Sequence, residues 1–281
     1  AQVNNSSTGS AYVFTKSGGS WSQVTELTAS GGASYDYFGS KVAIDGDTCV
    51  IGAAGTNSYA GSAYVFTRSG GSWSQVAELT ASDGASYDYF GSSIAIDGDT
   101  CVIGAGGTND YTGSAFVFTN TGGSWSQVAE LTVSGGANED QFGISVALDG
   151  DTCVIGAAGT NSSTGSAYVF TRSGGIWSQA AELTASGGAS EDQFGVSAAL
   201  DGDTCVIGAL GTNSYAGSAY VFTRSGGIWS QAAELTDPDG FSYDQFGISV
   251  AIDGGTCVIG GTDTILGTGS AYVFTNTGGS W

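Results

Sequence analysis

Histidine is absent from all 281 residues of the chain. Without an imidazole the protein cannot form a Ser-His-Asp or Cys-His nucleophile system, and it has no histidine ligands for a metal ion. Paired carboxylates are present, but they recur along the chain, whereas a glycosidase needs one acid and one base in differently tuned environments. We therefore expect a protein that is not an enzyme and has no catalytic residues.

Basic residues are scarce as well. Five Lys and Arg stand against 26 Asp and Glu, which gives a formal net charge of −21. A surface of that sign repels phosphate groups, so we expect no nucleic acid partner. No apolar run approaches the roughly 20 residues of a membrane span, so membrane insertion is not expected either. Cations, or ligands recognised by uncharged polar and aromatic groups, suit this composition better.

Methionine is also missing, and the first residues contain neither a basic n-region nor an apolar h-region. We expect any signal peptide to have been removed or to lie outside this chain. Asn-X-Ser sequons at Asn4, Asn5 and Asn161 are candidate glycosylation sites. Together with the low charge and the richness in Ser, Thr and Gly, they favour an extracellular or cell-surface location.

What the chain has in abundance is repetition with a period of 52 residues. The motif Gly-Ser-Ala-(Tyr/Phe)-Val-Phe, the cysteines and the tryptophans keep this period. A fixed period of this kind indicates a repeat architecture, in which each unit buries its faces against copies of itself. The Phe-Gly pair recurs with the same period, and its phenylalanines are Phe38, Phe90, Phe142, Phe194 and Phe246.

Each period contains four strand patterns, here taken from the first complete repeat. Residues 38–44 and 48–53 flank the hairpin turn Asp45-Gly46, residues 62–67 are aromatic and β-branched, and residues 73–80 alternate. Four antiparallel strands per repeat, arranged radially, make a propeller blade. We predict an all-β fold with almost no helix: a five-bladed β-propeller of four-stranded antiparallel blades, with the Phe-Gly strands innermost. A solenoid fits the strand count less well.

The strand patterns also predict how the ring closes. The pattern of the third strand occurs six times, once more than five blades need. We therefore expect one domain, residues 1–281, closed by overlapping termini. The blades are expected near residues 38–89, 90–141, 142–193, 194–245 and 246–281, the last completed by residues 1–37. Residues 269–281 would then be surplus and would dock on an adjacent copy. The alternatives are a surplus strand at the N-terminus and a longer repeat array.

The five cysteines share one strand phase, as in Thr48-Cys49-Val50. Equivalent positions around a ring lie farther apart than the roughly 7 Å that a disulfide allows between Cα atoms. Their odd number also argues against a disulfide framework. We expect buried free thiols that behave as small hydrophobic side chains.

Phe38-Gly39, the hydrophobic strand after it and Gly52-Ala53 resemble the FG-GAP repeat of integrin α-subunit propellers. They are more similar still to tandem FG-GAP-like repeats of secreted bacterial and archaeal proteins. The resemblance covers the whole chain and implies a propeller. The sequence departs from the Gly-Ala-Pro pattern, because proline is missing from that slot in every repeat and the last repeat reads Gly260-Gly261.

In integrins, several such repeats carry a calcium loop of alternating aspartates. Here the corresponding place holds only a short Asp45-Gly46-Asp47 turn and its equivalents. Calcium takes about six to eight oxygen ligands, and two carboxylates on a tight hairpin supply too few. We expect a solvated turn, no metal site and no cofactor. Weak Ca²⁺ binding is the alternative.

Two groups of longer loops should lie on one face: those after the second strands and those between blades. Tyrosine, aspartate and asparagine on exposed loops of a rigid scaffold are groups that bind sugars or protein surfaces. The alternative is that the aspartates hydrogen-bond their own loops and the tyrosines cover blade edges. The candidate ligand-binding residues are Tyr35, Asp36, Tyr37, Asn57, Tyr59, Tyr87, Asp88, Tyr89, Asn109, Tyr111, Asp140, Asp192, Asn213, Tyr215 and Asp244.

The sequence thus predicts a non-enzymatic extracellular or cell-surface module of structural or adhesive type. In this hypothesis it self-associates through a surplus terminal strand into a filament or oligomer. The alternative is a monomeric carbohydrate- or protein-binding module that uses the Tyr/Asp/Asn loop face. Sedimentation separates the two, since only the first predicts large particles.

Overall fold

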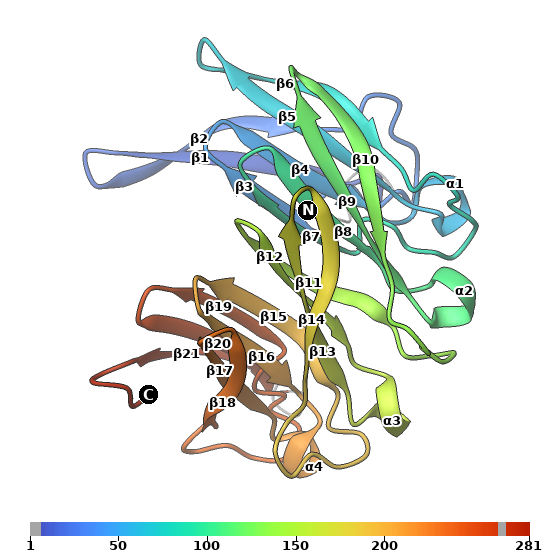
Figure 1. Cartoon of the computed structure of the whole chain (residues 1–281). Helices are drawn as coiled ribbons and strands as arrows, with labels where there is room; N and C mark the ends of the chain where they lie inside the picture. The colour runs from blue at the N-terminus through green and yellow to red at the C-terminus, as the bar shows by residue number, and fades with distance from the viewer. Residues whose placement is uncertain (1–6, 264–267) are drawn as a thin grey trace.

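Antiparallel strands build almost the whole molecule (Figure 1). The structure is a computed structural model that describes residues 7–263 and 268–281. Strands run in chain order from β1 to β21, interrupted by four short turns, α1 to α4, of four residues each. The expected all-β class with almost no helix is therefore confirmed. None of the described helical segments has the length and apolarity that crossing a membrane would require.

Four sheets in the described residues contain four strands each, paired antiparallel in chain order. Blade 1 consists of β3 (Val42–Asp45), β4 (Thr48–Ala53), β5 (Ser62–Ser69) and β6 (Ser72–Leu79). Blade 2 consists of β7 (Ser93–Asp97), β8 (Thr100–Ala105), β9 (Ser114–Thr121) and β10 (Ser124–Leu131). Blade 3 consists of β11 (Phe142–Asp149), β12 (Thr152–Ala157), β13 (Ser166–Ser173) and β14 (Ile176–Leu183). Blade 4 consists of β15 (Phe194–Asp201), β16 (Thr204–Ala209), β17 (Ser218–Ser225) and β18 (Ile228–Leu235).

Blade 5 has three strands, β19 (Ser249–Asp253), β20 (Thr256–Asp263) and β21 (Thr268–Thr275). The N-terminal hairpin, β1 (Ala11–Ser17) and β2 (Ser20–Leu27), forms a two-stranded sheet of its own. Residues in or next to the first strand of every blade line one common cavity of about 190 Å³. The Phe-Gly strands are therefore innermost, as expected of a β-propeller.

The hydrophobic core lies between consecutive blades. One cluster joins Val102 and Ala115 of blade 2 to Phe142 and Ile155 of blade 3, and equivalent clusters join the other neighbours. A strand that is covered on both faces reads as a continuous apolar run, which explains the uninterrupted Cys-Val-Ile pattern of the second strands. The blades are thus held together mainly by burial of apolar side chains.

Close approach between blades requires glycine on the second strand. A Cβ atom added to Gly156 would lie 1.9 Å from the carbonyl oxygen of Gly195 in blade 4. The same clash arises at the equivalent glycines of the other internal contacts, Gly52, Gly104 and Gly208. These glycines set the spacing between blades.

The termini do not overlap as expected. Strand β21 pairs with β20 over eight residues, so residues 269–275 belong to blade 5 and are not surplus. The N-terminal hairpin does not complete blade 5. It packs on blade 1 through Leu27 and Val13, and Gly9 forms the same bridge to Phe38 that Gly61 forms to Phe90. Pairing between chain neighbours has replaced the long-range closure, and Figure 1 shows the two terminal sheets at opposite ends of the arc.

All five cysteines are buried and free, as predicted. Burial raises the pKa of the Cys49 thiol to about 11 and that of Cys153 to about 12. The reactive thiolate is therefore scarce at neutral pH, and these side chains serve as packing groups.

Candidate functional site

The loops after the second strands of blades 1 to 4 carry the same left-handed turn. These turns are α1 (Thr56–Tyr59), α2 (Thr108–Tyr111), α3 (Thr160–Ser163) and α4 (Thr212–Tyr215), and Figure 1 shows them along one side of the molecule. In α1 the φ angles of Asn57, Ser58 and Tyr59 are 51°, 60° and 66°. Asparagine tolerates this region better than most residues. The four asparagines at this position, Asn57, Asn109, Asn161 and Asn213, therefore have a conformational role.

The loops between blades are braced by their own aspartates. The carboxylate of Asp36 accepts a hydrogen bond from the backbone N–H of Ala33 at 2.6 Å. The other blades repeat this bond at 2.7 Å through Asp88, Asp140, Asp192 and Asp244. Burial raises the pKa of Asp88. This is the structural alternative stated above, and a ligand-binding role for the aspartates stays a prediction.

Six of the predicted tyrosines come together in one row, which we call the tyrosine row: Tyr35, Tyr37, Tyr59, Tyr87, Tyr89 and Tyr111. Tyr59 is at its centre. Its ring is stacked on Tyr87 with centroids 5.7 Å apart and contacts Tyr37 at 6.3 Å and Tyr89 at 5.5 Å. The row therefore continues unbroken from the loop before blade 1 to α2 of blade 2.

Backbone hydrogen bonds hold the row in place. The N–H of Tyr89 donates to the carbonyl oxygen of Tyr59 at 2.8 Å, and the N–H of Tyr87 donates to Ser58 at 3.3 Å. The hydroxyl of Tyr59 raises the pKa of Tyr37, and burial is the main cause of the raised pKa of Tyr89. Both hydroxyls therefore keep their protons at neutral pH and can donate as well as accept hydrogen bonds.

The fold does not require tyrosine at these positions. Tyr87 and Tyr89 have φ angles of 71° and 57°, and Glu139 and Gln141 adopt 70° and 57° at the equivalent positions of the next repeat. Nor does the core require them, because Tyr35 and Tyr87 are 60% and 56% exposed. Exposed aromatic rings that neither backbone nor core demands are good candidates for ligand contacts.

The two remaining loop tyrosines, Tyr215 and Tyr243, form a separate pair. Tyr215 stacks on Tyr243 with ring centroids 6.0 Å apart and planes inclined by 8°. The predicted residue Tyr215 therefore lies outside the tyrosine row. Tyr243 was missing from the predicted residues, although its position in the repeat matches that of Tyr35 and Tyr87.

We expected the Asp-Gly-Asp turns to be solvated. In the structure their aspartates form hydrogen bonds and ion pairs within the protein. Asp97 accepts a hydrogen bond from Gly150 of the next blade at 2.6 Å, and the other turns repeat this contact. In three of the four turns the second aspartate pairs with an arginine that lies over a tryptophan ring, as in Asp151, Arg172 and Trp177. Among the described residues, no group of three or more acidic or cysteine side chains could hold a metal ion.

The candidate glycosylation sites divide between described and undescribed residues. Asn161 is exposed at the tip of α3. Asn4 and Asn5 lie outside the described residues.

Comparison with known proteins agrees with this geometry. The FG-GAP repeat family matches the chain five times, at residues 21–66, 73–118, 125–170, 177–222 and 229–274. The comparison with curated proteins gave no match. The first matched unit begins at Trp21 of the N-terminal hairpin, the other four begin at the tryptophan of a fourth strand, and each ends in the third strand of the following blade. The chain therefore belongs to the FG-GAP repeat family, and its repeats form the blades of a β-propeller.

Proposed function

We propose that the chain is a non-enzymatic, extracellular or cell-surface binding module of adhesive type, whose tyrosine row holds a glycan or protein ligand. The observation that carries the proposal is the unbroken row of partly exposed rings, which neither the backbone nor the core requires. A tyrosine ring offers a flat apolar face together with a hydroxyl group. It can therefore pack on a ligand while exchanging hydrogen bonds with it.

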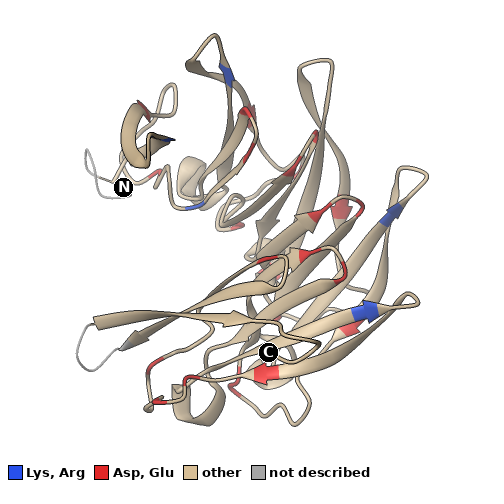
Figure 2. Cartoon of the chain, turned by 90° about the vertical axis from the view of Figure 1, so that its left-hand side faces the viewer, with Lys and Arg blue, Asp and Glu red and all other residues tan. Residues whose placement is uncertain are grey.

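Charge and family narrow the choice of ligand and location. Figure 2 shows acidic positions throughout the blades and few basic ones, and the net charge of −21 disfavours anionic ligands. FG-GAP repeats are typically extracellular. The absence of histidine and the commitment of the loop aspartates to backbone bonds support a function without catalysis.

The repeats themselves supply conservative replacements for testing the row. Tyr59→Ser and Tyr89→Gln introduce residues that Ser163 and Gln141 already show to be compatible with the same backbone. We expect the double variant to fold normally and to lose about tenfold or more in affinity for ligands detected on a glycan array or among extracellular matrix proteins.

Tyr215→Ser is the matched control, because it makes the same change outside the row. Thermal melts should be similar for all three proteins. Undiminished binding by the double variant, or an equal loss in the control, would contradict a role for the tyrosine row.

We propose self-association as a second function, supported by an apolar groove of about 450 Å³ between the N-terminal hairpin and blade 1. Val42 and Ile44 in this groove are each 62% exposed, whereas Ile94 and Ile96 at the equivalent positions of blade 2 are partly covered by their neighbours. The occupant we propose is blade 5 of a second copy, where Val273 is also exposed. Exposed apolar surface of this kind is typical of an association site.

Sedimentation velocity over a range of concentrations tests this second function. We expect oligomers that grow with concentration and that Ile44→Asp abolishes. Ile228→Asp, at a residue that is 73% exposed outside the groove, should leave them intact. A monomer at every concentration would refute self-association without affecting the tyrosine row.

A further inference from the structure

One contact that the other complete blades share is missing from blade 3. In blades 1, 2 and 4 a fourth-strand glutamine accepts a hydrogen bond from a serine N–H of the preceding loop, at 2.9–3.1 Å. The equivalent residues of blade 3 are Gln179 and Ser134, and this bond is absent between them. Among the described residues the Gln179 side chain has no hydrogen-bond partner, and it is exposed. The loop of residues 133–137 therefore does not close on β14.

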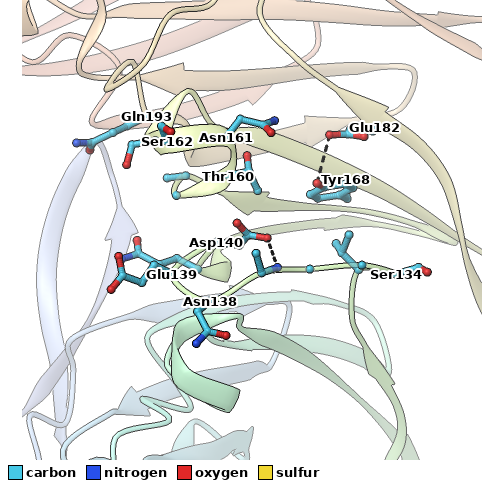
Figure 3. Close-up of a pocket in the computed structure, with 18 of the residues that line it drawn as sticks. Ser134, Asn138, Glu139, Asp140, Thr160, Asn161, Ser162, Tyr168, Glu182 and Gln193 are labelled. Atoms are coloured by element: carbon cyan, nitrogen blue, oxygen red, sulfur yellow. Dashed lines mark hydrogen bonds between the residues drawn. The ribbon is translucent and has the colours of Figure 1, made fainter.

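A cavity of about 990 Å³ opens in this place. Figure 3 shows its lining in two groups that face each other. One group comes from α3, from blade 3 and, at Gln193, from the loop that leads to blade 4, and the other comes from the loop between blades 2 and 3. The volume is at the upper end of the roughly 300–1,000 Å³ of typical small-molecule sites. The labelled residues are Thr160, Asn161, Ser162, Tyr168, Glu182 and Gln193 on one side, and Ser134, Asn138, Glu139 and Asp140 on the other.

Some polar groups of the lining are already engaged. Asp140 accepts from Ala137 at 2.7 Å, and Glu182 accepts from the Tyr168 hydroxyl at 3.2 Å. Others make no side-chain hydrogen bond within the described part of the chain, which leaves donors and acceptors for a ligand. These are Asn138, Glu139, Gln141, Asn161, Gln179 and Gln193.

The chemistry of these groups selects a class of ligand. Amides both donate and accept hydrogen bonds, so they suit a ligand that is rich in hydroxyl groups. The cavity lining contains no Lys or Arg and includes Glu139, so an anionic ligand is disfavoured. The described residues contain no cluster that could hold a metal ion. A neutral carbohydrate meets these conditions best.

The cavity borders the end of the tyrosine row. The N–H of Gln141 donates to the carbonyl oxygen of Tyr111 at 2.7 Å, and the N–H of Glu139 donates to Asp110 at 3.2 Å. We propose that the cavity binds the terminal unit of a neutral oligosaccharide whose following units stack on the tyrosine row. This inference rests on the proposed function, since it assigns a carbohydrate to the row.

Calorimetric titration with maltohexaose, cellohexaose and mannohexaose, each beside its disaccharide, tests the proposal. The disaccharides report on the cavity, whereas the hexasaccharides report on the cavity and the row together. For the sugar that binds, we expect Gln179→Ala to weaken binding of both lengths about tenfold. Gln179→Trp, which places a bulky ring against the lining of the cavity, should abolish binding of the disaccharide. Gln231→Ala and Gln231→Trp make the same changes in blade 4 and should leave both affinities unchanged.

The outcomes separate the two proposals. If Tyr59→Ser weakens hexasaccharide binding and the Gln179 variants do not, the cavity proposal fails and the tyrosine row stands. If only the Gln179 variants weaken binding, the cavity stands and the row has no part in it. If none of the sugars binds the unmodified protein, the cavity proposal fails, and the row is judged by the ligands found on the arrays.

Discussion

Replacing Phe142 with alanine will lower the free energy of unfolding by about 3–5 kcal/mol. Phe142 is only 1% exposed, and its ring lies 5.8 Å from that of Tyr168 and 5.9 Å from that of Phe170. Its cluster includes residues of both blade 2 and blade 3. Two hydrogen-bonded sheets cannot collapse into the space that the ring leaves, so the variant loses buried surface and also retains a cavity.

Denaturant unfolding monitored by tryptophan fluorescence measures this loss. Phe241→Ala is the control, because Phe241 is 75% exposed and the hydrogen bonds that it forms with Asp244 use only its backbone. We expect the control to change stability by less than about 0.5 kcal/mol. Similar losses in both variants would mean that the Phe-Gly residues do not anchor the blade interfaces.

A single methyl group at Gly156 will be nearly as damaging, at or above the upper end of the roughly 1–3 kcal/mol range for overpacking. The new Cβ would lie 1.9 Å from the oxygen and 2.8 Å from the carbon of the Gly195 carbonyl. Both are backbone atoms of the neighbouring blade and cannot rotate away. The φ angle of Gly156 lies outside the left-handed region, so the effect of alanine is steric alone.

Gly260→Ala is a matched control within the same chain. Gly260 occupies the equivalent position of blade 5, where the nearest atom to a new Cβ is the Ser249 hydroxyl oxygen, at 2.3 Å. Gly156 has the same neighbour in Ser145, at 2.4 Å, so this contribution cancels in the comparison. The difference in melting temperature between the two variants isolates the contact between blades. Equal shifts would show that this contact does not limit stability.

Much of the fold could be predicted because its determinants are local. The Asp45-Gly46 turn specifies a hairpin, and Gly46 indeed has a φ angle of 53°. Alternation and apolar runs locate the strands of each blade. Contacts between blades follow no local pattern. The bond from Gly150 to Asp97 joins residues 53 positions apart, and its existence depends on how two blades are placed relative to each other.

Ring closure failed as a prediction for the same reason. The sequence contains six third strands for five blades, but the strand count does not show whether the surplus strand lies at the N-terminus or at the C-terminus. The β20–β21 hairpin forms between chain neighbours, at a lower loss of chain entropy than closure across the whole chain. Local pairing therefore decides that the N-terminal hairpin is the extra element.

The sequence identified the tyrosines of the candidate site but not the contacts between their rings. The loop tyrosines could be identified from their exposure and residue type, but their contacts depend on the left-handed turn that places Tyr59 beside Tyr87. Few sequence differences point to the cavity in blade 3. Ser134 and Gln179 match the repeats of blades 1, 2 and 4. Two nearby residues differ: Val133 replaces the alanine of those loops, and Asn138 replaces their serine.

The bond that each hairpin aspartate forms to the following blade has a consequence for how such chains change over evolutionary time. A 52-residue unit carries its own connection to the next unit and three loop positions of the tyrosine row, which are those of Tyr35, Tyr37 and Tyr59. Duplicating one unit within the gene would therefore add one more set of these loop positions and repeat the same contacts between units. Substitutions at the three loop positions could then alter which ligand each unit binds without changing the strands of the blade.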